Sequence, residues 1–328
     1  MSRSRLVVHI TPTPLVAAPA KLARLLDGVL GWRSLCLCLA DYPKDLAGKF
    51  LGDAILWSGT DAEALAARAL ADASIVHVHN NLPQAVADQV SRLARDARFI
   101  YQVHSPLREG PLFMRRDDKI GLPFSARLVV AQYHARIYPD FRPVLNVVMH
   151  PGSTPAPLRR GERPRVLFSA THSRGGRWNG KLCAELDAAL DALSRQSIIE
   201  AVRPGPMPPG ALFELRRTCH ISVDEIITGS YHQVSLEGFA AGTAVVNGAD
   251  LFSIAMLREA ACIEEDEDEV PFVRTSPATV YHDLLALVRD PERLVNMQQA
   301  AADFHRRYLH PAINARRLAT LYEDILNA

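Results

Sequence analysis

Short apolar runs alternate with amphipathic helical segments from one end of the chain to the other. The runs are rich in valine, isoleucine and leucine, as is typical of strands buried on both faces. This alternation favours a parallel sheet, because parallel neighbours must be joined by a crossover that is usually a helix. We therefore predict an α/β fold with doubly wound parallel sheets. The expected strands are residues 6–10, 34–39, 74–79, 98–104, 127–131, 165–170, 198–202, 221–226 and 244–247, and the main expected helices are residues 19–30, 60–71, 83–97 and 179–193.

A turn-rich segment interrupts the alternation in the middle of the chain. Proline and glycine recur between residues 143 and 164, and the alternation restarts with the strand at 165–170. Such clusters are typical of connections between domains. A chain of 328 residues is long enough to form two cores. We expect one domain over residues 1–154, a second over residues 155–309, and an amphipathic helix over residues 310–328.

Composition excludes several classes of protein. The formal net charge is only +1, so we expect no nucleic-acid partner, which would need a basic stripe. The five cysteines lack zinc-knuckle spacing and are expected to be reduced thiols, and no apolar run reaches membrane-spanning length. These features favour a cytoplasmic protein. Arginines in the first domain could meet an anionic acceptor or a membrane surface, although solvated charges are the simpler interpretation. Composition does not predict the oligomeric state.

Residues 226–246 contain the most informative local pattern. An apolar run ends in Gly229 and Ser230, a short helix follows, and Gly242 ends that helix before a β-branched strand. A glycine turn between a strand and a helix directs backbone N–H groups and the positive helix end toward one point, where an anion can bind. The residues expected to bind it are Gly229, Ser230, Tyr231 and His232. Glu237 lies about two turns into the helix and is expected to accept hydrogen bonds from sugar hydroxyls.

A basic, glycine-containing loop follows the first strand of the second domain. Arg174, Arg177 and Lys181 are cationic, and two adjacent glycines would let the backbone approach an anion closely. The loop resembles the segment in which GT-B glycosyltransferases bind their donor diphosphate with an arginine and a lysine, so the resemblance makes these three residues the candidate diphosphate ligands. Two cations can stabilise the charge of a departing diphosphate without a metal, so we expect no metal and no cofactor. The alternative is a solvated basic surface loop.

Histidines mark the ends of two expected strands in the first domain. His104 ends the strand at 98–104, where doubly wound sheets place their ligand crevice. Its imidazole could bond a sugar hydroxyl or accept a proton, and the alternative is a structural histidine. His77 and His79 share one face of their strand. A metal would need a third ligand, which the spacing does not indicate.

The segment after Gly229 resembles the donor-site segment of nucleotide-sugar glycosyltransferases with the GT-B fold, especially the retaining family 4. Glu237 falls on the second glutamate of that family's motif, residues 242–246 follow in register, and Gly229 stands where the first glutamate would be. The strands ending at Asn80 and His104 resemble that family's corresponding strands. The resemblance implies two Rossmann-like domains facing across a cleft, with an acceptor domain first and a donor domain second. It also implies a terminal helix that returns to the first domain.

The resemblance implies a glycosyltransferase that moves a sugar from a nucleotide-diphosphate donor to a glycan, a lipid-linked glycan or a protein. The reaction would need no metal and would retain the anomeric configuration. His104 would face the reacting sugar, and the donor-site residues named above would bind the nucleotide. Two alternatives stay open. One is a non-catalytic GT-B protein that binds a sugar or a partner chain, and the other is a nucleotide-sugar 2-epimerase.

Overall fold

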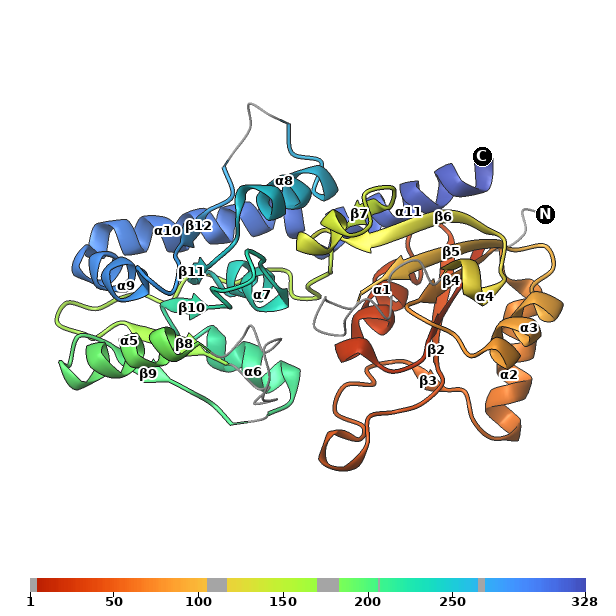
Figure 1. Cartoon of the computed structure of the whole chain (residues 1–328), viewed down its shortest axis with the longest axis horizontal. Coiled ribbons are helices and arrows are strands. Elements are labelled where there is room, and N and C mark those ends of the chain that lie inside the picture. Colours follow the sequence, from red (N-terminus) through yellow and green to blue (C-terminus); the bar gives the residue numbers. More distant parts are fainter. Residues whose placement is uncertain (1–4, 105–116, 170–182, 206, 265–268) are drawn as a thin grey trace. The chain divides into compact units, whose positions relative to one another are not determined.

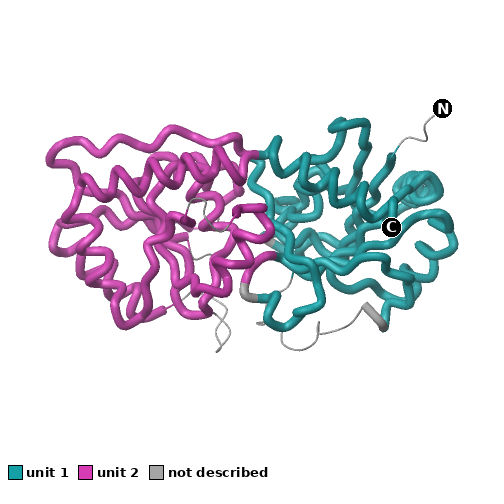
Figure 2. The backbone as a smooth tube through the Cα atoms, turned by 90° about the horizontal axis from the view of Figure 1, so that it is seen from above, with its two compact units in different colours: residues 1–130, 134–149, 311–328 teal, residues 131–133, 150–310 magenta. Residues whose placement is uncertain are grey.

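The computed structural model describes residues 5–104, 117–169, 183–205, 207–264 and 269–328 (Figure 1). The chain divides into two compact units (Figure 2). Unit 1 contains residues 1–130, 134–149 and 311–328, and unit 2 contains residues 131–133 and 150–310. The main border thus falls between residues 149 and 150, five residues before the expected one. The terminal helix belongs to unit 1.

Unit 1 is built on a seven-stranded sheet with the order β3-β2-β1-β4-β5-β6-β7, and every neighbouring pair is parallel. Helices α1 and α11 lie on one side of this sheet and α2 and α3 on the other (Figure 1). The strands are β1 (Arg5–Thr11), β2 (Trp32–Cys38), β3 (Ile55–Leu56), β4 (Ile75–His79), β5 (Arg98–Val103), β6 (Phe124–Val130) and β7 (Arg142–Val144). The helices are α1 (Ala18–Leu26), α2 (Thr60–Asp72), α3 (Gln84–Leu93), α4 (Asp117–Ile120) and α11 (Pro311–Asn327).

Helix α11 completes the core of unit 1. All five residues of β4 are buried, as expected for a central parallel strand covered on both faces. Alternate residues of the central strands, among them Val7 and Ile75, pack against Tyr322 and Ile325 of α11. Burying a large apolar side chain stabilises the folded state by about 1.5–3 kcal/mol. The last helix is therefore an integral layer of this unit.

Unit 2 has a five-stranded sheet with the order β12-β11-β10-β8-β9, again with every neighbouring pair parallel. The strands are β8 (Arg165–Phe168), β9 (Glu200–Val202), β10 (Ile221–Val223), β11 (Ala244–Asn247) and β12 (Phe272–Arg274). The helices are α5 (Ala184–Arg195), α6 (Pro209–Arg216), α7 (Gln233–Ala241), α8 (Leu251–Ala260), α9 (Val280–Arg289) and α10 (Pro291–Phe304). None of the helices in the described ranges is both long and apolar enough to cross a lipid bilayer.

Gly242 ends α7 as the sequence predicts. Its backbone adopts the left-handed conformation with φ +70°, and a Cβ atom there would lie 3.0 Å from backbone atoms of Pro155. Both constraints favour glycine, because the left-handed conformation is strained for other residues and their Cβ atom would clash with the Pro155 backbone. The position fixes where α7 ends and β11 begins, and so fixes the length of α7.

A buried histidine makes the stability of unit 2 depend on pH. His305, in the π-helical turn His305–Leu309, is fully buried, and burial together with His310 and His150 lowers its pKa to about 4. An unfolded histidine titrates near 6.5, so between pH 6.5 and 4 only the unfolded chain binds the proton. The stability contributed by neutral His305 is therefore complete above pH 6.5 and is lost as the pH falls toward 4.

Replacing His305 by leucine should make unit 2 less sensitive to acid. We expect the loss of unfolding free energy between pH 7 and pH 4.5 to be smaller by about 2–3 kcal/mol in the His305→Leu variant than in the wild type. Chemical denaturation at the two pH values measures this difference. If the two proteins lose the same unfolding free energy between the two pH values, His305 is not the source of the acid sensitivity.

Candidate functional site

The candidate donor site of unit 2 lies where β10 ends and α7 begins. The connecting loop turns at Gly229, whose backbone is left-handed with φ +76°. The Gly229 carbonyl accepts hydrogen bonds from the Asp250 N–H (3.0 Å) and the Ser253 hydroxyl (2.7 Å) at the start of α8. A Cβ atom at position 229 would lie 2.7 Å from Asp250 Oδ2. A glutamate at position 229 would need this left-handed backbone and a shift of the Asp250 carboxylate, so both the conformation and the contact favour glycine.

Asp224, the first residue after β10, caps helix α7. Its side chain is buried, and Oδ2 accepts hydrogen bonds from the His232 N–H (2.7 Å), the Ser235 N–H (3.3 Å) and the Ser235 hydroxyl (2.8 Å). A carboxylate at a helix N-terminus satisfies unpaired N–H groups and interacts favourably with the helix dipole. Asp224 therefore fixes the start of α7 to the end of β10.

The next residue, Glu225, organises the turn itself. Its buried carboxylate accepts hydrogen bonds from the N–H groups of Ile227 (2.8 Å), Thr228 (2.9 Å) and Ser230 (3.3 Å), and from the Thr228 hydroxyl. Several N–H donors around one carboxylate hold a tight turn in a single conformation. Two adjacent acidic side chains thus shape the loop from inside.

These internal contacts change how the expected anion-binding residues can act. The N–H groups of Ser230 and His232 already donate to Glu225 and Asp224. Tyr231 is fully buried, and its hydroxyl donates to the carbonyl of Ala131 while burial raises its pKa. The Ser230 side chain is also fully buried and donates to the Tyr231 carbonyl.

Two other residues of the loop are partly accessible. Gly229 is half-buried, and the His232 side chain is 22% exposed although its Nδ1 lies 3.5 Å from Oδ1 of Asp224. The backbone N–H groups of Gly229 and Val234 make no hydrogen bond with any residue that the structure describes. Val234 is in the first turn of α7, where the positive end of the helix dipole adds to the attraction for an anion.

Glu237 is held by a buried cation. Its carboxylate, 17% exposed, lies 3.4 Å from Nη2 of Arg216, whose side chain is completely buried at the end of α6. Arg216 also donates to the hydroxyl of Ser222 on β10 at 3.3 Å. The pairing leaves Glu237 partly accessible while restricting its rotamers, because the guanidinium is itself fixed by packing. Glu237 is thus an oriented acceptor of hydrogen bonds.

Sequence reasoning missed the groups that build this site: Asp224, Glu225, Arg216 and Asp250. Asp224 and Glu225 fall inside the strand expected at 221–226, whereas β10 ends at Val223 and leaves both at the edge where doubly wound sheets bind ligands. Arg216 gave no indication in the sequence, because its partner lies on another helix. Arg174, Arg177 and Lys181 lie outside the described residues.

In unit 1, His104 lies just beyond the carboxyl end of β5. The backbone N–H of His104 donates to Oδ1 of Asn80 (2.8 Å), and Nε2 of its ring lies 2.8 Å from Nδ1 of His79. Burial lowers the pKa of His104 to about 3, so the imidazole is neutral near pH 7. With Nε2 engaged, Nδ1 is the ring nitrogen left to contact a substrate. Residues 105–116, which follow His104, lie outside the described residues.

His79 extends this arrangement into the core. Its other ring nitrogen, Nε2, lies 2.9 Å from Nδ1 of His9 on β1. His77 occupies the same face of β4, and its Nδ1 lies 2.8 Å from the Tyr322 hydroxyl. We call His9, His77, His79 and His104 the histidine cluster. The sequence did not single out His9, because strand pairing alone brings it beside His77.

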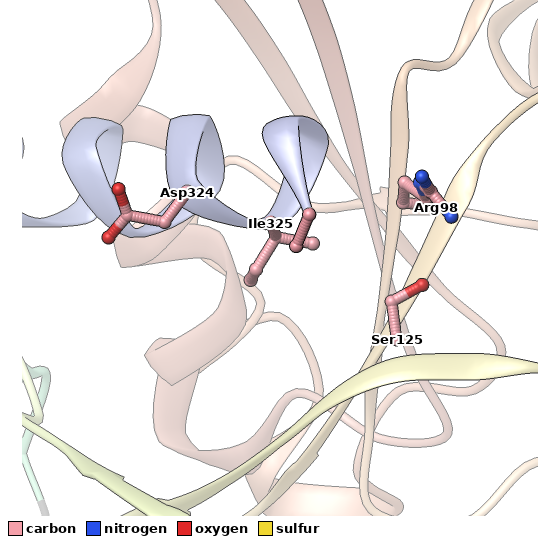
Figure 3. Close-up of a pocket in the computed structure, with 5 residues that line it drawn as sticks. Arg98, Ser125, Asp324 and Ile325 are labelled. Carbon is pink, nitrogen blue, oxygen red and sulfur yellow. The ribbon is translucent and has the colours of Figure 1, made fainter.

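Unit 1 also has a surface pocket of about 430 Å³ (Figure 3). It is lined by Arg98, Ser125, Asp324, Ile325 and Ala328. Ile325 of α11 points toward the pocket, whereas the Asp324 carboxylate points away from Arg98 and Ser125 (Figure 3). Arg98 and Ser125 lie at the amino ends of β5 and β6, opposite the edge that carries His104. Ligand sites of doubly wound sheets lie at the carboxyl ends, so we assign this pocket no role.

Comparison with known proteins establishes the fold. No sequence model of a known protein family matches the chain, and no curated protein matches it in sequence. The structure of an α-glucosyltransferase in complex with UDP-glucose and DNA containing an abasic site has a TM-score of 0.61 at 10% identity, covering 99% of this chain and 99% of that chain. The sucrose-phosphate synthase from Thermosynechococcus elongatus has a TM-score of 0.57 at 11% identity, covering 98% of this chain and 100% of that chain.

A UDP-N-acetylglucosamine 2-epimerase shares the same fold, with a TM-score of 0.53 at 12% identity and coverage of 98% of this chain and 96% of that chain. At identities this low the similarity establishes architecture and not activity. It confirms the predicted GT-B fold of two Rossmann-like domains.

Proposed function

We propose that this protein is a glycosyltransferase that uses a nucleotide-diphosphate sugar as its donor. The observation that carries the proposal is Glu237, a partly exposed carboxylate fixed by the buried Arg216 on the helix that follows the Gly229 turn. A preoriented carboxylate suits a pair of ribose hydroxyls, because it accepts two hydrogen bonds without reorganising. Whole-length similarity to a glucosyltransferase bound to UDP-glucose supports the same class of donor.

Each group of the donor has a candidate partner in unit 2. Glu237 accepts hydrogen bonds from the ribose hydroxyls. The N–H groups of Gly229 and Val234, at the positive end of α7, bind a phosphate oxygen, while Arg174, Arg177 and Lys181 supply positive charge to the diphosphate. This last assignment is from the sequence alone.

During transfer, the bond between the anomeric carbon and the diphosphate oxygen breaks and a bond to an acceptor oxygen forms. The diphosphate leaves with the bonding electron pair, and the cationic side chains stabilise its charge without a metal. The acceptor hydroxyl gives its proton to an oxygen of the departing diphosphate, which has gained the bonding electron pair. In unit 1 we assign His104 to a hydrogen bond with the substrate through Nδ1, and we propose retention of configuration on the basis of the family resemblance.

A thermal-shift screen of the full chain against nucleoside diphosphates and their sugars tests the donor class. Binding to the folded state raises its stability by mass action, by about 2.7 kcal/mol at a ligand concentration 100 times the Kd. We expect at least one nucleoside diphosphate to raise the melting temperature and the matching monophosphate to have a smaller effect. The proposal is wrong if no member of the panel shifts the transition.

The products then separate the three activities that fit the fold. A transferase releases the nucleoside diphosphate faster when an acceptor is added. A 2-epimerase, whose fold this chain shares, interconverts two donor sugars without an acceptor. A non-catalytic binding protein shows a thermal shift with neither reaction.

A further inference from the structure

The histidine cluster lies on one face of the unit 1 sheet, at the carboxyl ends of its central strands. His9 on β1 is the registered partner of His77 on β4, and His79 follows two residues later on the same face. The three side chains are fully buried, and one ring nitrogen from each lies within 4.8 Å of the others. Three imidazoles therefore converge on one point from two adjacent strands.

We propose that His9, His77 and His79 bind one divalent transition-metal ion, with zinc as the first ion to test. Neutral imidazole is a good ligand for zinc and the related ions, and three histidines with one further ligand form a common tetrahedral site. The proposal is independent of the transferase activity proposed above, because it concerns only residues of the unit 1 core.

The histidine cluster contains buried ring nitrogens without a hydrogen-bond partner among the described residues. Nε2 of His9 and Nε2 of His77 are buried and have no hydrogen-bond partner among the described residues. A buried polar atom without a partner destabilises the folded state, so burying several imidazoles together is unfavourable unless something compensates. A bound metal ion would engage the unpartnered Nε2 of His77, while His9 would bind it through Nδ1, the nitrogen that faces His79 Nε2.

Contacts at the second ring nitrogen orient two of the three histidines. Metal-binding histidines usually bond their second ring nitrogen to another group, which fixes the tautomer and the ring plane. Nδ1 of His77 lies 2.8 Å from the Tyr322 hydroxyl, and Nδ1 of His79 lies 2.8 Å from Nε2 of His104. Both contacts leave Nε2 of His77 and of His79 as the ligand atoms.

The protonation state agrees with ligation. Burial, followed by the neighbouring histidines, lowers the pKa of His77 and of His79, and burial followed by His104 lowers the pKa of His9 to about 3. The three imidazoles are therefore neutral near pH 7, which is the form that binds a metal.

Space and a fourth ligand complete the site. His9 Nδ1 and His79 Nε2 lie 2.9 Å apart, whereas two nitrogens about 2.05 Å from one tetrahedral ion are about 3.3 Å apart. The rings must therefore separate by roughly half an ångström to admit the ion. Gln102, the registered partner of His79, brings a buried amide without a well-formed hydrogen bond to the same face. Its oxygen, or a water molecule, can supply the fourth ligand.

Zinc binding to the full chain tests the proposal. The protein is purified without a polyhistidine tag, stripped with a chelator, incubated with zinc and passed through a desalting column before elemental analysis. We expect one zinc per chain. The His77→Gln variant should bind at least about 100-fold more weakly in competition with a chromogenic chelator, and Tyr322→Phe about 10-fold more weakly through the lost orienting contact. His282→Gln, on α9 of unit 2, should bind like the wild type.

Two further measurements decide the result if His77→Gln fails to fold by circular dichroism. Tyr322→Phe keeps the aromatic packing, and cobalt in place of zinc should give the visible absorption of a four-coordinate site. The proposal is overturned if the wild type retains no zinc, or if Tyr322→Phe and His282→Gln bind equally tightly and the cobalt spectrum is that of the hydrated ion. The histidine cluster is then a hydrogen-bonded chain of imidazoles without a metal.

Discussion

Replacing Glu237 by glutamine should lower the rate of sugar transfer by about 100-fold or more, with most of the effect on donor binding. A carboxylate makes charge-assisted hydrogen bonds of about 1.5–3 kcal/mol each, and two ribose hydroxyls would lose this strength together. The variant should also be less stable, by about 1–3 kcal/mol, because Arg216 keeps its charge in a fully buried position without a counter-charge. Steady-state kinetics over a range of donor concentrations separates the two effects.

A double variant separates the loss of function from the loss of stability. Arg216→Met combined with Glu237→Gln removes the uncompensated charge, so we expect stability to recover while transfer stays low. Glu214→Gln is the matched control, since Glu214 is an exposed residue of α6 that pairs with Arg217 at the surface. Its rate should equal that of the wild type. Full transfer activity and an unchanged donor KM in Glu237→Gln would remove Glu237 from the donor site.

Replacing Asp224 by alanine should destabilise unit 2 by about 3–5 kcal/mol. The change removes the acceptor for two backbone N–H groups at the start of α7 and for the buried Ser235 hydroxyl. Loss of a helix cap costs about 0.5–2 kcal/mol, and each buried donor left unpaired adds about 1–3 kcal/mol. Urea denaturation measures the difference in unfolding free energy.

Asp290 provides the comparison for Asp224. It caps α10 with one hydrogen bond to the Arg293 N–H at 2.9 Å, in an exposed position. Asp290→Ala should therefore cost only about 1 kcal/mol. If the two substitutions cost the same, Asp224 is an ordinary cap and does not organise the loop between β10 and α7.

Most strands and long helices of the fold were predictable from the sequence, and three short edge strands were not. The strand at 244–247 has the predicted bounds, and the ends of the central strands of unit 1 differ from prediction by at most three residues. Strands β3, β7 and β12 have only two or three residues each and were missed. Such edge strands carry too few residues to show a period, and their pairing with neighbours decides their existence.

The candidate sites depended more strongly on tertiary contacts. The turn at Gly229 and the end of α7 at Gly242 follow from local backbone chemistry and were predicted. The hydrogen-bond acceptors of the loop N–H groups were not predicted, because they are the carboxylates of Asp224 and Glu225, whose orientation depends on tertiary contacts. His9 lies beside His77 because β1 pairs with β4, and the sequence does not specify this order of strands.

A crystal structure of the full chain soaked with the nucleoside diphosphate that gives the largest thermal shift is the most direct test of the donor site. We expect density for the nucleotide at the carboxyl end of β10, with its ribose hydroxyls within hydrogen-bond distance of Glu237 and a phosphate oxygen at the N–H of Gly229 or Val234. A nucleotide bound elsewhere in the chain, with this loop unoccupied, would contradict the account.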